Sequence, residues 1–372
     1  MSIFKAFMAL VLAIQTLSAT ISAADISAKE NIKIQQERMT YLENEFYSDY
    51  TPGDERRFTS FNLDAAIESG VKFNEVRFLA THNSYQLAPT DEYRTFYTAL
   101  SEATFGLIND ELLEFEMETL TEQFEMGIRS VELDIETVDD GNEVNFIVCH
   151  NPLNDNTSSC YDFETALKEI KMWSDNNPGH LPITVIIEPK RIVPPVNNLK
   201  PFRFSYAVRC DEIVREIMGD TLLTPKDMMG DYKSLKEMRE NDGWLPLGET
   251  MGKVIFYLHD SDATSGYINQ DKSLKSQAMF PMLRYMDRNK SYASVIIDNV
   301  ASEAALHKKE NIDKCKVIVR VRADSFPDYS EKRYAQTEEC MAQIVSTDYP
   351  VKKGEAKYHQ YSFDGYTVTL QR

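Results

Sequence analysis

The stretch RFLATHNSYQ (77–86) contains a short apolar run that ends abruptly in two polar residues. The run 78–80 is typical of a buried strand, whereas His82 and Asn83 bind phosphate or metal ions well and build a core poorly. We therefore predict a strand that carries functional side chains at its carboxyl end.

Seven further short runs repeat this pattern, and helical stretches separate most of them. All eight are rich in β-branched or apolar residues and end in polar groups; they lie at 76–82, 128–136, 145–150, 183–190, 253–260, 293–299, 315–324 and 342–350. Strands that alternate with helices indicate βαβ units and a parallel sheet. No G-x-G-x-x-G follows the first run, which argues against an open dinucleotide-binding sheet. The pattern predicts an α/β fold, a closed parallel (β/α)₈ barrel of the TIM type.

The barrel is expected to span residues 69–372, after a polar helical extension at 25–68. A long connection, 191–250, follows the fourth predicted strand, and we interpret it as an elaborated loop rather than a second domain. The final stretch, YHQYSFDGYTVTLQR (358–372), predicts an additional strand attached to the barrel.

The amino terminus has the features of a secretory signal peptide. Lys5 precedes the apolar segment AFMALVLAIQTL (6–17), and small residues follow, with a cleavage site after Ala24. Polar residues interrupt the apolar run before the roughly 18 residues that a membrane-spanning helix needs. We expect residues 1–24 to be removed, and the mature chain to be secreted without a transmembrane span.

Charge and cysteine content limit the partners and the compartment. The net charge of −19 argues against nucleic acid, whose phosphates require a basic surface. An anionic substrate would need a metal ion or local positive charge.

In an oxidising compartment the five cysteines permit two disulfides and one free thiol, and the disulfides that we expect are Cys149–Cys160 and Cys315–Cys340.

Polar residues at the ends of successive predicted strands form the candidate site. The carboxyl ends of barrel strands meet at one mouth, so we expect these side chains to converge. In chain order they are His82, Asn83, Glu132, Asp134, His150 and Glu188.

Four of these residues suit a hard cation. Glu132 and Asp134 alternate along a strand and so face the same side, where two carboxylates repel unless a cation or proton neutralises them. Asn83 adds an amide oxygen and Glu188 a third carboxylate. This oxygen set suits a hard ion, Ca²⁺ or Mg²⁺, rather than zinc. Extracellular calcium would fill even a weak site, which favours Ca²⁺ over Mg²⁺.

The two histidines suit proton transfer. His82 and His150, flanking a metal-bound phosphate, can donate and accept protons near neutral pH. A metal clamp with paired histidines describes phosphodiester cleavage. The other histidines are expected to be structural or on the surface, namely His180, His259, His307 and His359. Of these, His259 follows an apolar strand and could reach the mouth.

These motifs resemble a known family. THNSY, GIRSVELDIE, VCHN and VIIEPK together resemble the catalytic X-region of phosphatidylinositol-specific phospholipase C, in the order seen in its calcium-dependent branch. Later segments, among them VIVRVRAD and IVSTDYP, are similar to the secreted single-domain form. The resemblance covers roughly residues 70–350.

The resemblance implies a mechanism. Ca²⁺ would hold the substrate phosphate, and Glu132 or Glu188 would take the proton of the attacking inositol 2-hydroxyl. His82 would stabilise charge on the phosphorane, and His150 would protonate the departing diacylglycerol oxygen. The implied products are diacylglycerol and inositol 1,2-cyclic phosphate, with slow hydrolysis to inositol phosphate.

Basic residues at predicted strand ends are candidates for substrate binding. Lys190, Arg320 and Arg322 are placed to contact phosphate or inositol hydroxyls, and Asp324 and Asp348 to orient them. No basic cluster marks a polyphosphoinositide pocket, so phosphatidylinositol or a glycosylated form is the expected substrate. We expect a monomer that acts on phospholipid at a membrane surface.

Two alternatives remain open. A glycerophosphodiester phosphodiesterase or a sphingomyelinase-D-like lipase would use the same barrel, but those families typically do not place His and Asn next to each other as in His82–Asn83. A non-catalytic lipid-binding barrel is the second alternative. Retention of both histidines and all four metal-ligand candidates argues against it.

Overall fold

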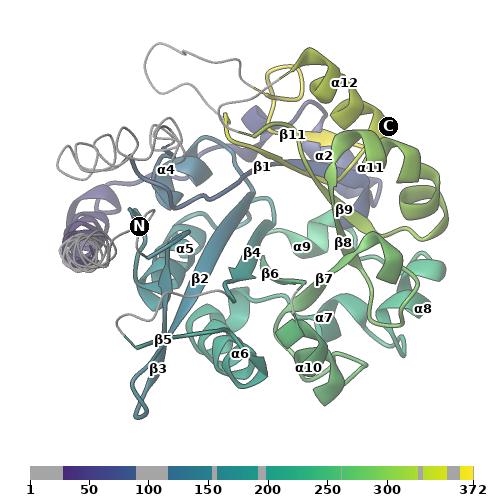
Figure 1. Cartoon of the computed structure of the whole chain (residues 1–372). Coiled ribbons are helices and arrows are strands. Elements are labelled where there is room, and N and C mark those ends of the chain that lie inside the picture. Colours follow the sequence, from purple (N-terminus) through teal and green to yellow (C-terminus); the bar gives the residue numbers. More distant parts are fainter. Residues whose placement is uncertain are drawn as a thin grey trace, which may run out of the picture.

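Eight parallel strands close into a barrel at the centre of the molecule, with helices around the outside (Figure 1). This confirms the predicted TIM-type fold. The predicted signal segment, 1–24, lies outside the residues that the structure describes. The computed structural model describes residues 28–88, 116–152, 157–191, 198–260, 262–325, 330–349 and 361–371.

Each barrel strand pairs in parallel with its two neighbours. Closure between the first two strands is the shortest pairing, a single pair between Ala80 and Ser130. Around the barrel the strands are β1 (Val76–Thr81), β2 (Ser130–Asp139), β4 (Ile183–Pro189), β6 (Val254–His259), β7 (Phe280–Arg284), β8 (Val295–Val300), β9 (Ile318–Arg322) and β10 (Ile344–Thr347).

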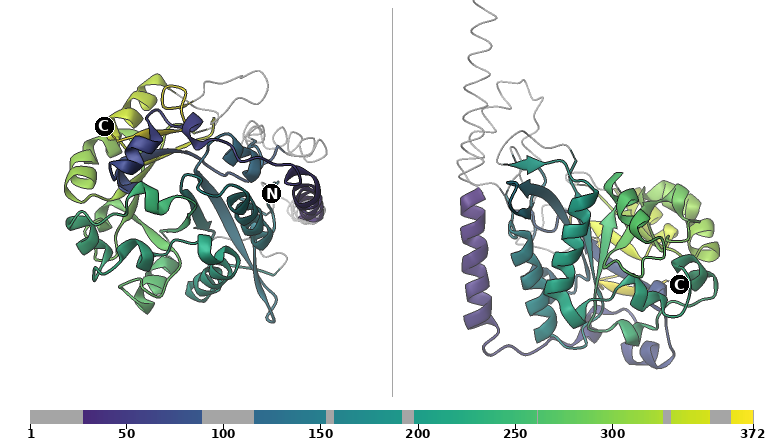
Figure 2. Two further views of the ribbon diagram at one scale, coloured as in Figure 1. Left: turned by 180° about the vertical axis from the view of Figure 1, so that it is seen from behind. Right: turned by 90° about the horizontal axis from the view of Figure 1, so that it is seen from below.

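The helices cover the outer face of the barrel (Figures 1 and 2). Many begin with a side-chain cap: Asp162, for example, accepts a hydrogen bond from the Thr165 amide at the start of α5. The helices are α2 (Leu63–Glu68), α4 (Leu120–Glu125), α5 (Phe163–Asn176), α6 (Phe204–Met218), α7 (Pro225–Met229), α8 (Leu235–Glu240), α9 (Leu247–Thr250), α10 (Asp262–Gln270), α11 (Ala301–Lys308) and α12 (Glu331–Cys340).

Alternation along the strands divides the core into two layers. Val131 and Leu133 on β2 belong to one buried cluster, which includes the inner faces of the surrounding helices. Phe78 and Ile186, from β1 and β4, belong to the other, which fills the barrel. Since neighbours along a strand face opposite sides, the residues that alternate with Val131 and Leu133 point into the barrel.

One predicted barrel strand has a different place. The run 145–150 does form a strand, β3 (Val144–Val148), but it pairs antiparallel with β2 in a hairpin beyond the barrel. The connection between them is too short for the crossover that a parallel pair requires. The missing barrel strand is β7, which the sequence pattern did not reveal because it is short and contains Pro281.

The predicted attachments to the barrel are present. β11 (Val368–Leu370) pairs antiparallel with β1, as expected for the end of the chain. The long connection after β4 carries β5 (Leu199–Lys200), which pairs with β2, and four of the helices. It is therefore an elaborated loop. Among the described residues, no helix combines the length and the apolar character that crossing a bilayer requires.

The two predicted disulfides are absent. All five cysteines lie in the described part of the chain, and none is joined to another. Cys340 is buried and donates its S–H to the carbonyl of Thr337, while Cys315 Sγ lies 3.4 Å from Asn289 Oδ1. The number of cysteines can be counted from the sequence, but a disulfide also requires the backbone to hold two thiols at bonding distance and in the right direction.

The amino-terminal helix, 28–41, lies along the outside of the barrel beside α5 (Figure 2). Gln35 binds the backbone of Asp162 twice, accepting from its N–H and donating to its carbonyl. Arg38 forms an ion pair with Glu169, whose side chain is fully buried. These contacts join the extension to the body of the barrel.

We expect Arg38→Met to destabilise the protein by about 3 kcal/mol, because it leaves the Glu169 carboxylate buried without its cation. Urea unfolding would measure the loss. Lys33→Met is the matched control, because Lys33 pairs with Glu37 on the exposed face of the same helix, and it should change stability by less than about 0.5 kcal/mol. Equal effects of the two variants would contradict this role for Arg38.

Candidate active site

Three acidic side chains meet inside the mouth of the barrel. Ligand oxygens of Glu132, Asp134 and Glu188 lie within 4.8 Å of one another. The register explains the meeting, since Asp134 on β2 is directly paired with Glu188 on β4. Glu132 and Asp134 are buried and Glu188 is half-buried.

Two basic side chains bind this acidic cluster. Lys190 Nζ lies 2.6 Å from Asp134 Oδ2 and 3.1 Å from Glu188 Oε1. Arg320 Nη2, from β9 across the barrel, lies 2.5 Å from Glu132 Oε2. Two of the three basic residues predicted to bind substrate are thus paired with carboxylates predicted to bind metal.

Burial and mutual repulsion perturb the acids. Burial, followed by repulsion from Glu188, raises the pKa of Asp134 to about 6, although Lys190 lowers it. Burial also opposes charge on Glu188, but attraction by Lys190 and His259 outweighs it and holds the pKa of that carboxyl below its usual range. A cluster of this kind favours a cation strongly.

The cluster fits a hard cation such as calcium. Asp134 Oδ1 is buried and has no hydrogen-bond partner among the described residues, whereas Oδ2 accepts a hydrogen bond from the Tyr85 hydroxyl at 2.9 Å. Asn83, the predicted neutral ligand, is buried at the end of β1. Its φ of 47° is left-handed, a conformation that asparagine tolerates better than most residues. Carboxylate and amide oxygens are the ligands that calcium prefers.

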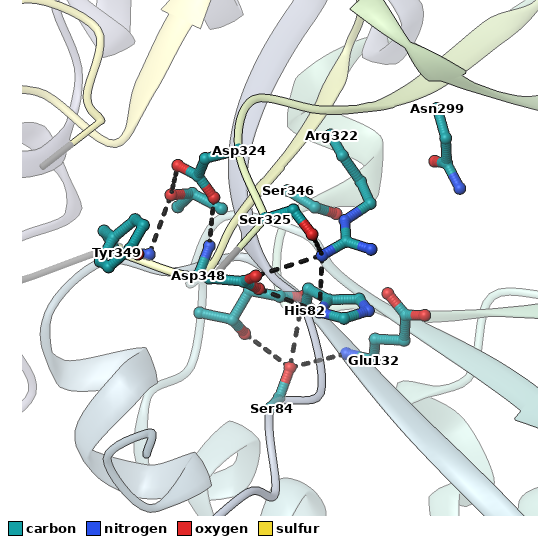
Figure 3. A network of polar contacts seen from close by, with 12 residues as sticks. His82, Ser84, Glu132, Asn299, Arg322, Asp324, Ser325, Ser346, Asp348 and Tyr349 are labelled. Atoms are coloured by element: carbon teal, nitrogen blue, oxygen red, sulfur yellow. Dashed lines mark hydrogen bonds and ion pairs between the residues drawn. The ribbon is translucent and has the colours of Figure 1, made fainter. Parts of the chain in front are cut away.

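His82 is held by a carboxylate from the last barrel strand. Its Nδ1 lies 2.9 Å from Asp348 Oδ1, a carboxylate oxygen that accepts a hydrogen bond from a protonated Nδ1, and 3.2 Å from Arg322 Nη2. Arg322 Nη2 lies 3.1 Å from Asp348 Oδ2 and also contacts Ser325 Oγ. Figure 3 shows this network beside Glu132. The arrangement fixes the direction of the imidazole ring.

A second carboxylate, Asp324, holds the chain behind Asp348 (Figure 3). Asp324 accepts hydrogen bonds from the Asp348 amide at 2.6 Å and from the hydroxyls of Thr347 and Tyr334. Asp324 is fully buried, and this burial raises its pKa to about 6. Its bonds fix the backbone from which Asp348 reaches His82.

His150 reaches the site from the hairpin rather than from a barrel strand. It follows β3, is exposed, and lies close enough to Asp134 to lower the pKa of that carboxyl. The neighbouring Cys149 amide donates to the Asp134 carbonyl at 3.1 Å, which ties the end of the hairpin to β2. The structure therefore brings His150 to the edge of the acidic cluster.

Sequence reasoning missed several side chains of the site. His259, which the sequence placed within reach of the mouth but which we did not count among the site residues, ends β6 close to Glu188. Tyr85 binds Asp134, and Glu136 follows Glu132 and Asp134 on the same face of β2. The alternation in VELDIE was a signal for Glu136.

The other histidines lie apart from these contacts. His180 is buried and contacts Ser174, as expected of a structural residue. His307 contacts Asp298 and stacks on Tyr285. His359 lies outside the described residues.

Comparison with known protein families identifies one family whose model matches more than half of the chain. The family described as "Phosphoinositide phospholipase C, Ca2+-dependent" matches residues 140–372. The chain belongs to this family. Its members are phosphodiesterases. The matched part of this chain contains His150 and Glu188, whereas β1 and β2 lie before it. No curated protein matches the chain.

Solved structures share the fold. A calcium-dependent phosphoinositol-specific phospholipase C from Pseudomonas sp., described as a myoinositol complex, is 19% identical, with a TM-score of 0.58 over 86% of this chain and 100% of that one. A Ca²⁺-dependent phosphatidylinositol-specific phospholipase C from Streptomyces antibioticus is 17% identical, with a TM-score of 0.51 over 74% of this chain and 94% of that one.

The stability of the chelator-treated protein should fall as the pH rises from 5 to 8. Burial raises the pKa of Glu136 from 4.5 to about 8, although Lys190 lowers it. Above pH 4.5 the unfolded chain loses this proton while the folded chain retains it, so folding is progressively disfavoured up to about pH 8. Glu136→Gln cannot ionise and should show a smaller decrease in Tm, measured by calorimetry. An equal decrease in both proteins would contradict the assignment.

Proposed function

We propose that this protein is a secreted, calcium-dependent phosphodiesterase that cleaves phosphatidylinositol, or a glycosylated form of it. The products would be diacylglycerol and inositol 1,2-cyclic phosphate. The observation that carries the proposal is the placement of the His82–Asp348 pair and the three-carboxylate cluster at the same end of the barrel.

Four oxygen ligands would hold the ion, namely Asn83, Glu132, Asp134 and Glu188. Bound calcium would supply positive charge at the phosphate and a lower pKa for a coordinated hydroxyl. Asp134 Oδ1 supports this assignment, because it is buried without a hydrogen-bond partner in the described part of the chain, and such an oxygen costs free energy until a cation satisfies it.

The chain's own groups would move the protons. Glu132 or Glu188 would accept the proton of the inositol 2-hydroxyl as its oxygen bonds to phosphorus. His82, fixed through Nδ1, would present Nε2 to the phosphate and stabilise the developing charge. His150 would donate a proton to the diacylglycerol oxygen as its bond to phosphorus breaks.

Basic side chains would orient the headgroup. Arg322 lies beside His82 and Asp348, where a phosphate that contacts His82 would also be within its reach. Arg320 is held by Ser346 and Asn299 and would contact the headgroup deeper in the barrel. Lys190 lies at the opposite side, where it pairs with Asp134 and Glu188 in the absence of an ion.

Secretion fits this chemistry. The predicted signal at 1–24 would place the enzyme in millimolar calcium, where a modest site is occupied. The net charge of −19 also makes a cation valuable at a site for an anionic phosphodiester.

The proposal is tested with vesicles that contain phosphatidylinositol radiolabelled in the headgroup. We expect water-soluble inositol 1,2-cyclic phosphate in the presence of calcium, and loss of its release on addition of a chelator. Release that ignores the chelator would discard the calcium assignment. Choline or ethanolamine products would indicate the alternative lipase class, and absence of turnover on all phospholipids would indicate a binding protein.

His150→Ala should lower kcat by at least about 10²-fold, because the leaving oxygen loses its acid. The residue is exposed, so Tm should stay within a few degrees of the parent protein. A substrate whose leaving group needs no proton, such as a nitrophenyl ester of inositol phosphate, should be affected much less. An equal loss on both substrates would contradict the acid role.

Asp348→Asn should lower kcat by about 10²-fold with little change in KM, because an amide can hold the wrong imidazole tautomer. Steady-state kinetics on the same vesicles measures the two constants. Asp348→Glu would partly restore kcat if the carboxylate is what matters. A change confined to KM would assign Asp348 to substrate binding instead.

A further inference from the structure

Lys190 occupies an unusual position for a substrate-binding residue. Its ammonium group bridges two of the three clustered carboxylates, at 2.6 Å from Asp134 and 3.1 Å from Glu188. The side chain is 18% exposed, so much of this charge is removed from water. Its backbone N–H is fixed by the carbonyl of Ile135 at 2.9 Å.

We propose that Lys190 is a built-in competitor of the metal ion. Its ammonium neutralises Asp134 and Glu188 while no calcium is bound, and it must leave them for the ion to bind. Lys190 therefore sets the calcium affinity of the site. The inference rests on the proposed calcium site, but it concerns ion binding and not lipid turnover.

Electrostatics requires this competition. An oxygen that accepts a short hydrogen bond from an ammonium cannot give the same lone pair to calcium. The two cations would also repel each other at a separation of a few ångströms inside a site of low dielectric. Binding of the ion thus includes the cost of breaking both contacts of Lys190.

Arg320, the other cation of the cluster, is not equally free to move. Its guanidinium also binds Ser346 Oγ and Asn299 Oδ1, and its side chain is 2% exposed. Lysine carries a compact charge on a flexible stem, whereas the planar guanidinium is held by several bonds at once. We therefore expect Arg320 to stay in place and Lys190 to move.

Glu136 provides a place for the displaced ammonium. It lies two residues beyond Asp134 on the same face of β2, and its side chain is 1% exposed. Its Oε2 has no hydrogen-bond partner among the described residues, and Lys190 is near enough to act on it electrostatically. A turn of the lysine stem toward Glu136 would clear Asp134 and keep the ammonium paired.

The first experiment is calorimetric titration of chelator-stripped protein with calcium chloride. Lys190→Met should bind calcium about tenfold more tightly than the parent. Lys171→Met is the control, since it removes the same charge from a surface pair with Asp175 on α5 and should leave the affinity unchanged. Unchanged or weaker binding by Lys190→Met would overturn the proposal.

The second experiment is a double-mutant cycle with Glu136→Gln. In the parent, this change should weaken calcium binding about threefold, because the displaced ammonium loses its partner. In Lys190→Met the same change should have no effect on affinity. Equal weakening in both backgrounds would remove Glu136 from the exchange and assign its effect to direct attraction of the ion.

Thermal unfolding in chelator gives an independent readout. Lys190→Met should lose several degrees of Tm there, since Asp134 and Glu188 then face each other without the ammonium, and should recover fully in calcium. If neither protein binds calcium, this proposal and the calcium assignment both fail. If both bind as expected but no lipid is cleaved, the competition stands and the proposed function fails.

Discussion

The structure depends on one electrostatic constraint, namely that three carboxylates share a buried cavity and cannot remain charged there without cations. Glu132, Asp134 and Glu188 repel one another at close range, and the barrel removes most of the water that would screen them. Lys190 and Arg320 supply the compensating charge. An acidic protein thereby builds the local site that we propose for a divalent ion and, through that ion, for an anionic phosphodiester.

The same barrel fixes His82 by a separate route. The histidine ends β1, its carboxylate partner follows β10, and those two strands are paired in parallel. Asp324, after β9, then holds the backbone of Asp348. Three neighbouring strands thus orient one imidazole through successive layers of hydrogen bonds. The catalytic role that we propose for His82 requires such a fixed orientation.

Much of this was readable in the sequence because strand alternation is a strict rule. The spacing of Glu132 and Asp134 predicted a shared face, and parallel strands predicted convergence with Glu188. The place of His150 was not readable as a barrel-strand end, since its strand turned out to be half of a hairpin. Pairings such as His82 with Asp348 join the first and the last strand of the barrel, which are far apart in the sequence. Local sequence patterns contain no information about such distant contacts.

The contacts that hold the site together also help to close the barrel. β1 and β2 share a single backbone pair, but next to it Ser84 donates its N–H to the Glu132 carbonyl, and its hydroxyl accepts from the Glu132 amide. Ser84, which follows His82 by two residues, therefore adds hydrogen bonds between the two barrel strands that have the shortest pairing. Because these bonds fix the start of the acidic cluster relative to the histidine, a chain that fails to close here also loses the geometry on which its chemistry depends.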